Sequence, residues 1–214
     1  MPGRPRGSRT ALRYPPHVPR PKVHDDALRV RLLERAGHTL SAKGLRALSL
    51  RQLATDVGTS TTAVYSLFGG KPALLTALFD EAFHRFGTHL ATVTPSDDPF
   101  EDLVQLGIAY RASALDDPHF YEVMFGTIRA DITMDPGSLA RAAGTFEPLL
   151  RMVRRAIDAG ALRAEEPSVI AMSLWAMVHG LVSLEMRGFL PPGAPDPGQA
   201  FSKAVRANLA GWRP

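Results

Sequence analysis

Glycines divide residues 49–71, SLRQLATDVGTSTTAVYSLFGGK, into two short segments that both have the pattern of a helix. Ser49 and Ser60 are preferred N-cap residues, and each precedes an apolar pattern of barely two turns. Gly58 ends the first pattern and Gly69 ends the second, since glycine is the usual residue just after a helix. Two short helices joined by a tight glycine turn, with a longer helix before them, have the outline of a helix-turn-helix module.

Helical periodicity also fills most of the remaining chain. A first helix is predicted from about residue 25 to Gly44, where leucine and alanine recur at spacings of three and four. Pro72 fits the first turn of a long helix over about residues 71–93. Further helices are predicted over residues 99–117, 119–126, 138–163, 167–190 and 198–212. No stretch alternates with the period of two that a strand requires, so we expect an all-α fold without a sheet.

Two of these later helices carry a specific expectation. Pro148 lies inside the pattern of residues 138–163, so that helix should kink or break in two. Residues 167–190 are apolar nearly all the way round, so that helix should be buried on most sides.

Composition excludes several classes of protein. The 214 residues contain no cysteine, which rules out disulfides, cysteine-ligated zinc and a thiol nucleophile. No uninterrupted run of 18 or more apolar residues free of charge occurs, so we expect no membrane span. Nothing in the sequence argues against the cytoplasm, which is the expected location. The N-terminus lacks the apolar stretch of a secretory signal.

Charge is unevenly distributed along the chain. Residues 1–22 contain six Lys or Arg and no acid, residues 23–71 contain seven against four acids, and residues 72–214 contain twelve against seventeen. A basic front on an acidic body indicates a polyanionic partner for the front. The basic, proline-rich residues 1–22 should be disordered, either as an arm that contacts this polyanion or simply as a solvated leader.

The second short helix carries small polar side chains. With its apolar residues packed inward, Thr61, Thr62 and Ser66 are free to face outward, where hydroxyls suit phosphate oxygens and base edges alike. Tyr65 lies on the flank, where its hydroxyl can reach a phosphate. Lys71 stands at the positive end of a helix dipole, which is unfavourable unless an anion binds there. The alternative is that its ammonium is merely solvated.

The segment LSLRQLATDVGTSTTAVYSLFGGKPALLTALF resembles the DNA-binding segment of TetR-family transcriptional regulators. The family pattern is matched, in order and in spacing, by Ala54, Gly58, Ser60, Tyr65, Phe68, Lys71 and Leu74. Leu67 departs from the histidine or tyrosine frequent at its position, and Gly69-Gly70 replace the commoner polar pair. The resemblance implies phosphate contacts from Tyr65 and Lys71, within a DNA-binding set of Arg51, Ser60, Thr61, Thr62, Tyr65, Ser66 and Lys71.

In that family the remaining helices bind a small effector and dimerise. The resemblance therefore implies a DNA-binding domain over residues 23–71 and an effector-binding and dimerisation domain over residues 72–214. WAMVHGLVSLEM, which contains Trp175, His179 and Gly180, is similar to a Trp-His-Gly pattern in one subgroup of TetR C-terminal domains.

Aromatic and methionine side chains line apolar pockets, although any one of them can instead be an ordinary core residue. The candidates for an effector pocket are Phe86, Tyr110, Tyr121, Met124 and Trp175. The last two helices offer apolar faces for a four-helix dimer interface. The candidates for that interface are Leu181, Leu184, Phe201, Val205 and Leu209.

No catalytic, cofactor or metal site is predicted. His179 and Glu185 are six residues apart and His84 and His89 are five apart, so neither pair shares one helical face. His179 is instead expected to be a hydrogen-bonded core residue.

The predicted function is that of a dimeric, effector-responsive DNA-binding regulator. It would be a repressor, released from a palindromic operator by a small, largely hydrophobic effector. The alternative is a small-molecule-binding or sequestering protein that binds DNA without sequence preference.

Overall fold

The computed structural model describes residues 22–126, 132, 134–190, 193 and 196–214. Within these ranges every regular element is a helix, as the sequence predicts. Residues 1–21, which make up nearly all of the predicted basic tail, lie outside the described residues.

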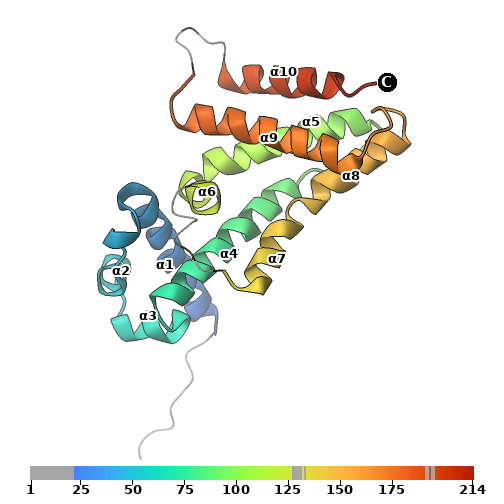
Figure 1. The fold of residues 1–214 in the computed structure, drawn as a ribbon. Coiled ribbons are helices and arrows are strands. Elements are labelled where there is room, and N and C mark those ends of the chain that lie inside the picture. Colours follow the sequence, from blue (N-terminus) through green and yellow to red (C-terminus); the bar gives the residue numbers. More distant parts are fainter. Residues whose placement is uncertain (1–21, 127–131, 133, 191–192, 194–195) are drawn as a thin grey trace, which may run out of the picture.

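The N-terminal helices form a small head at the lower left of Figure 1. α1 (Lys22–Lys43) packs against α2 (Leu50–Val57) and α3 (Thr61–Phe68), and the short 3-10 helix η1 (Leu45–Ala47) connects α1 to α2. Arg35 of α1 binds Asp56 of α2 at 2.7 Å, and the guanidinium of Arg29 lies over the ring of Phe68. Polar and apolar contacts thus hold both short helices on the longer one.

Glycine ends both short helices, as predicted. Gly58 and Gly69 have φ angles of 72° and 75°, in the left-handed region that glycine adopts without a steric cost. The N–H of Thr59 donates to the carbonyl of Ala54 at 2.9 Å and closes the end of α2. Ser60 then caps α3, because its hydroxyl accepts the N–H of Ala63 at 3.1 Å. These local contacts determine the turn between α2 and α3.

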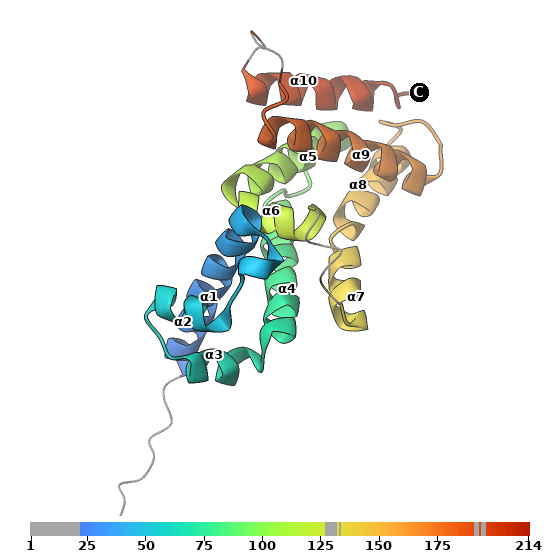
Figure 2. The same cartoon turned by 60° about the vertical axis from the view of Figure 1, so that its left-hand side comes forward.

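α4 (Lys71–Leu90) links the head to the rest of the molecule. Its 20 residues span about 30 Å at 1.5 Å per residue. It contacts α1 and α3 in the head, and also α5 (Pro99–Asp116), α6 (Pro118–Phe125) and α7 (Pro136–Gly144). Figure 2 shows α4 beside α1, and α6 is the helix of the body that packs against α1.

The body is a bundle around α9 (Pro167–Met186), which packs against α5, α8 (Glu147–Asp158) and α10 (Pro197–Ala210). The helix predicted around Pro148 is broken in two, as expected: α7 ends at Gly144 and α8 begins at Glu147. Pro148 lies in the first turn of α8, where a missing backbone N–H has no cost.

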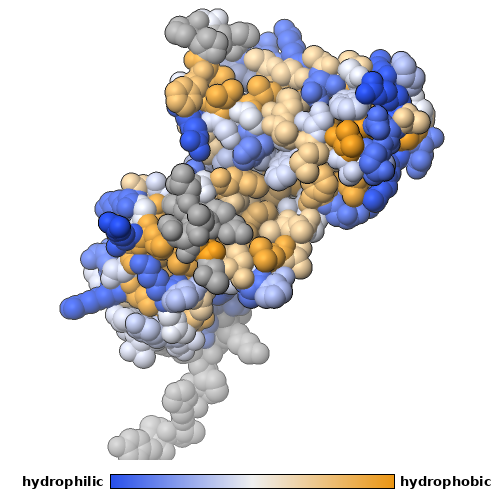
Figure 3. Space-filling model, in the orientation of Figure 1, coloured by the Kyte–Doolittle hydropathy of each residue, from blue (hydrophilic) through white to orange (hydrophobic). Residues whose placement is uncertain are grey.

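The expectation that the helix over residues 167–190 is buried on most sides is wrong for the single chain. Val169, Met172 and Leu184 are 49%, 53% and 47% exposed. α9 has the length and composition of a membrane span, but its opposite face packs into the body through residues such as Ile170 and Val178. Apolar side chains therefore remain uncovered along one side of α9. Figure 3, in the orientation of Figure 1, shows apolar surface in the upper part of the molecule, where α9 lies.

Candidate functional site

The outer face of α3 carries the predicted hydroxyl side chains. Thr62, Tyr65 and Ser66 are exposed and Thr61 is half-buried, whereas Val64 and Phe68 are buried beneath them. Arg51, also exposed, lies in the first turn of α2. α3 lies at the end of the head farthest from the body (Figure 2). The head therefore presents short polar side chains and one tyrosine on a convex helix.

Lys71 has a partner within the chain that sequence reasoning did not anticipate. Its Nζ donates a hydrogen bond to the carbonyl oxygen of Leu45 in η1 at 2.9 Å. This bond ties the start of α4 to the segment before α2, so the ammonium is neither bare nor merely solvated. Two of its three N–H groups are still available for an anion, and the predicted phosphate contact stays a prediction.

A cavity of about 430 Å³ opens in the body between α4, α5, α7, α8 and α9. None of the described residues that line it is charged, and most are aromatic or aliphatic. Of the five predicted pocket residues, Phe86, Tyr110 and Trp175 line it. Tyr121 and Met124 are instead buried in α6 and are not among its lining residues.

The pocket also includes residues that were not selected from the sequence. α4 contributes Phe79, Phe83, Phe86 and Leu90, which recur at spacings of four, three and four along one face. That periodicity was visible in the sequence, but it indicates only a buried face. Whether such a face closes on a core or on a cavity depends on the helices opposite it.

Three polar side chains meet behind one wall of the pocket. The hydroxyls of Tyr110 and Tyr121 lie 2.9 and 2.8 Å from Nδ1 of His179. Burial raises the pKa of both tyrosines and lowers the pKa of His179, so all three are uncharged at neutral pH. The expectation that His179 is hydrogen-bonded is confirmed, although its side chain is half-buried and not fully in the core. Its Tyr110 partner also lines the pocket.

Two family profiles match the chain. Residues 32–78 match the profile described as "Bacterial regulatory proteins, tetR family", and residues 103–208 match "Tetracyclin repressor-like, C-terminal domain". The chain belongs to the TetR family of transcriptional regulators. The first match begins in α1 and ends in α4, so it contains the whole helix-turn-helix of this TetR-family protein. The second begins in α5 and ends in α10.

Solved structures share this fold along most of the chain. A protein with unknown function from Rhodococcus sp. RHA1 is 28% identical, with a TM-score of 0.76 over 87% of this chain and 96% of that one. The TetR-family transcriptional regulator PfmR from Thermus thermophilus is 22% identical, with a TM-score of 0.69 over 84% and 97%. A regulatory protein of the tetR family from Rhodococcus RHA1 is 20% identical, with a TM-score of 0.70 over 87% and 97%. No curated protein matches the sequence significantly. Membership of the Trp-His-Gly subgroup stays a prediction.

The candidates for the dimer interface divide into two groups. Leu184 is exposed and Leu181 is half-buried on α9. Phe201, Val205 and Leu209 of α10 are buried inside the single chain, with 4%, 2% and 0% of their surface exposed. These three were wrongly assigned, because α10 turns its apolar face inward toward α5 and α9.

Glu185, considered above beside His179, has a different partner. Its carboxylate binds the guanidinium of Arg111 through two hydrogen bonds of 2.7 and 2.5 Å. Glu185 thus pairs with Arg111 and not with His179. The TetR family is a class of transcription regulators.

A group of side chains with metal-ligand chemistry escaped the sequence reasoning. Glu34 and His38 of α1 and His119 of α6 bring one ligand atom each to within 4.8 Å of one another. Glu34 and His38 are four residues apart and share a helical face, a signal that the sequence did contain. His119 is 85 residues from Glu34, so their proximity depends on the packing of α6 on α1.

Proposed function

We propose that this TetR-family protein is a ligand-responsive repressor. A homodimer would bind a roughly palindromic operator in the cytoplasm through residues 23–71, and a small, largely apolar effector bound within residues 72–214 would release it. The observation that carries the proposal is that one helix, α4, begins at the exposed head and also lines the apolar cavity.

The coupling between the two sites runs through α4. Lys71 at its first residue is bonded to η1 of the head, and Phe79, Phe83 and Phe86 face the cavity. Two recognition helices of a dimer must lie about 34–36 Å apart, or a multiple of that distance, to enter successive major grooves. An effector that binds more tightly to a conformer with another spacing lowers the population of dimers that fits DNA. The size of this shift is limited by the difference between the effector's affinities for the two conformers.

The lining of the cavity indicates the class of effector. An uncharged apolar body fits a wall without charged residues, and one polar group of the effector can hydrogen-bond the hydroxyl of Tyr110. A charged effector would lose its hydration without gaining a charged partner in this wall.

Binding of an apolar compound should change the fluorescence of Trp175. The protein has two tryptophans, and a Trp212→Phe variant leaves the pocket residue Trp175 as the reporter. Titration of this variant with decanol, an uncharged apolar probe, should change its emission saturably. Ala142→Leu, which adds bulk to the cavity wall, should weaken the response at least tenfold. If the Trp212→Phe protein responded equally with and without Ala142→Leu, the probe would bind outside this cavity.

The uncovered side of α9 is the surface proposed for dimerisation. Val169, Met172, Ala176 and Leu184 are exposed and lie on one side of the helix. On α10, Ala207 is exposed and Ala200 and Ala204 are half-buried, and such small side chains would allow close approach of a second helix.

Leu184→Arg should convert the dimer to a monomer, because it places a charge in the apolar interface. Leu184 is 47% exposed in the single chain, so the substitution should leave the fold intact. Light scattering after size exclusion measures the mass, and Val30→Arg on the similarly exposed Val30 of α1 is the matched control. If the Leu184→Arg protein remained dimeric, this face of α9 would not be part of the dimer interface.

Footprinting on DNA upstream of the gene distinguishes the proposal from the sequestering alternative. A single protected palindrome is expected, and it should be lost when an effector is added. Uniform coverage of the DNA with a steep dependence on salt would instead identify non-specific binding by a basic head.

A further inference from the structure

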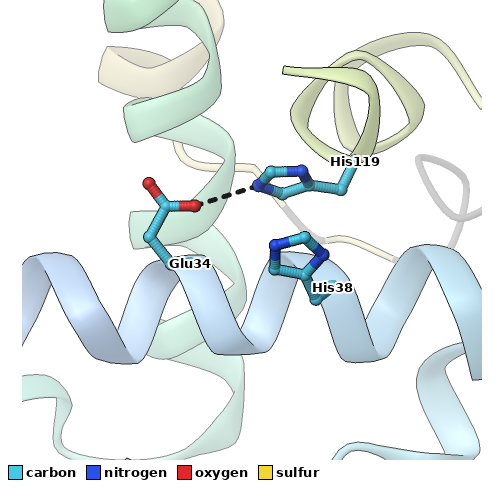
Figure 4. A group of neighbouring side chains, drawn as sticks. All are labelled: Glu34, His38 and His119. Carbon is cyan, nitrogen blue, oxygen red and sulfur yellow. Dashed lines mark hydrogen bonds and ion pairs between the residues drawn. The ribbon is translucent and has the colours of Figure 1, made fainter. Parts of the chain in front are cut away.

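We propose that Glu34, His38 and His119 form a binding site for a divalent transition-metal ion such as Zn²⁺, which joins α1 of the head to α6 of the body. Figure 4 shows the carboxylate and the two imidazoles gathered between the two helices. The proposal adds an inorganic ligand to the molecule and does not depend on the effector pocket.

The geometry of the three side chains is close to that of a metal site. Nε2 of His119 lies 3.1 Å from Oε2 of Glu34, and the rings of His38 and His119 stack with centroids 4.1 Å apart. Two ligand atoms at 2.0–2.2 Å from a tetrahedral zinc ion are about 3.3–3.6 Å apart. The Glu34–His119 pair, at 3.1 Å, is slightly closer than this, and the exposed His38 ring would rotate to supply the third ligand.

The donor set suits zinc and its neighbours in the first transition series. Two imidazoles and one carboxylate are the protein ligands of many zinc sites, and imidazole favours Zn, Cu, Fe and Ni over Mg or Ca. Three protein ligands leave at least one position for water. His38 is exposed whereas His119 is buried, so an ion can enter from the side of His38.

The surrounding residues support a cation at this place. Arg85 binds Oε1 of Glu34 at 2.5 Å, which orients the carboxylate and leaves Oε2 toward His119. Arg85 is itself shared with Glu81 and Asp117. Three carboxylates therefore surround one guanidinium, and the excess negative charge favours a bound cation.

The close approach of α6 to α1 is built into the backbone at Gly37. A Cβ atom at this position would lie 2.7 Å from Cδ2 of His119, so any larger residue would push His119 away from Glu34 and His38. With glycine at position 37, the imidazole lies directly on α1. An ion bound there would fasten the head to α6.

The test is binding of Co²⁺ and Zn²⁺ to the untagged full-length protein. Co²⁺ gives visible absorption that reports nitrogen and oxygen ligands, and Zn²⁺ should displace it. We expect one ion per chain, and binding roughly tenfold weaker or worse in each of His38→Ala and His119→Ala. His84→Ala, which removes an exposed histidine of α4, should bind as the unchanged protein does.

Thermal unfolding provides a second measurement. Zn²⁺ should raise the Tm of the unchanged protein and of His84→Ala, because it binds the folded state, but not that of His38→Ala. His38 is exposed, so this variant folds even if His119→Ala does not. Absence of saturable Co²⁺ binding, or binding that His38→Ala leaves intact, would overturn the proposal. Neither measurement uses DNA, so failure here is separate from failure of the proposed regulatory function.

Discussion

Tyr65→Phe is expected to lower the affinity of the dimer for its operator about 100-fold. The Tyr65 side chain is 52% exposed on α3, and no described residue hydrogen-bonds its hydroxyl. A hydrogen bond to a charged phosphate contributes about 1.5 kcal/mol or more, and a dimer has two heads, so the loss is about 3 kcal/mol. Electrophoretic mobility shift or fluorescence anisotropy with the footprinted DNA measures it.

The loss should be similar for every DNA sequence, since phosphate contacts carry no sequence information. Thr62→Val is the contrasting variant: it should change the preferred base at one position of each half-site. Thermal unfolding of both variants should match the unchanged protein, because both side chains are exposed. Unaltered operator affinity in Tyr65→Phe would mean that this hydroxyl does not contact phosphate, and unaltered preference in Thr62→Val would remove Thr62 from base reading. Lys71 is a poorer choice for this test, because its bond to Leu45 also supports the head.

Asp102→Asn is expected to lower the free energy of unfolding by about 2–3 kcal/mol. The Asp102 side chain is almost fully buried at the start of α5. It accepts hydrogen bonds from the N–H and hydroxyl of Ser96, at 3.0 and 2.7 Å, and from Arg155 of α8 at 2.5 Å. The amide keeps the shape but removes the charge, so Arg155 loses its charged partner and keeps the carbonyl oxygen of Ser96. For a chain of this length the Tm should fall by roughly 5–10 °C.

Glu147→Gln is the matched control, because it removes another carboxylate–arginine pair of α8. Glu147 and Arg154 are 3.4 Å apart and about half exposed, and such a pair contributes about 0–1 kcal/mol. Its Tm should therefore change little. If the two variants lowered the Tm equally, the burial of Asp102 would not increase its contribution to stability.

The effect of Asp102→Asn should depend on pH. Burial opposes the charged form, but hydrogen bonds from Ser96 and Arg155 outweigh it and lower the pKa of Asp102. A lowered pKa means that the stabilisation is present above the unfolded value, about 3.9, and disappears as the pH falls through the folded value. The Tm difference between the two proteins should thus be constant near neutral pH and shrink in acid.

The head could be predicted almost completely from the sequence. Ser49, Ser60, Gly58 and Gly69 act through their own backbone and that of residues three to five positions away. The structure shows the N-caps and the glycine helix ends that were expected, and both glycines are left-handed. The break near Pro148 was predictable for the same reason, because proline lacks an N–H wherever it is placed.

The body could be predicted only as a set of helices. Phe201, Val205 and Leu209 have the spacing of one apolar face, but the spacing does not say whether that face meets the same chain or a second copy. The direction in which α10 turns depends on its contacts with α5 and α9. Tyr121 and Met124 were placed in the pocket for their chemistry, yet α6 buries them behind its wall.

The sequence by itself determined which segments are helices, where the two short helices of the head end, and the family, because these depend on residues within one or two turns of each other and on a local motif. Only the tertiary structure decided what lies between the helices. It brought His179 against two tyrosines from α5 and α6, Lys71 to Leu45, and His119 to Glu34 and His38. Such contacts join residues far apart in the chain, and side-chain packing over the whole molecule selects them.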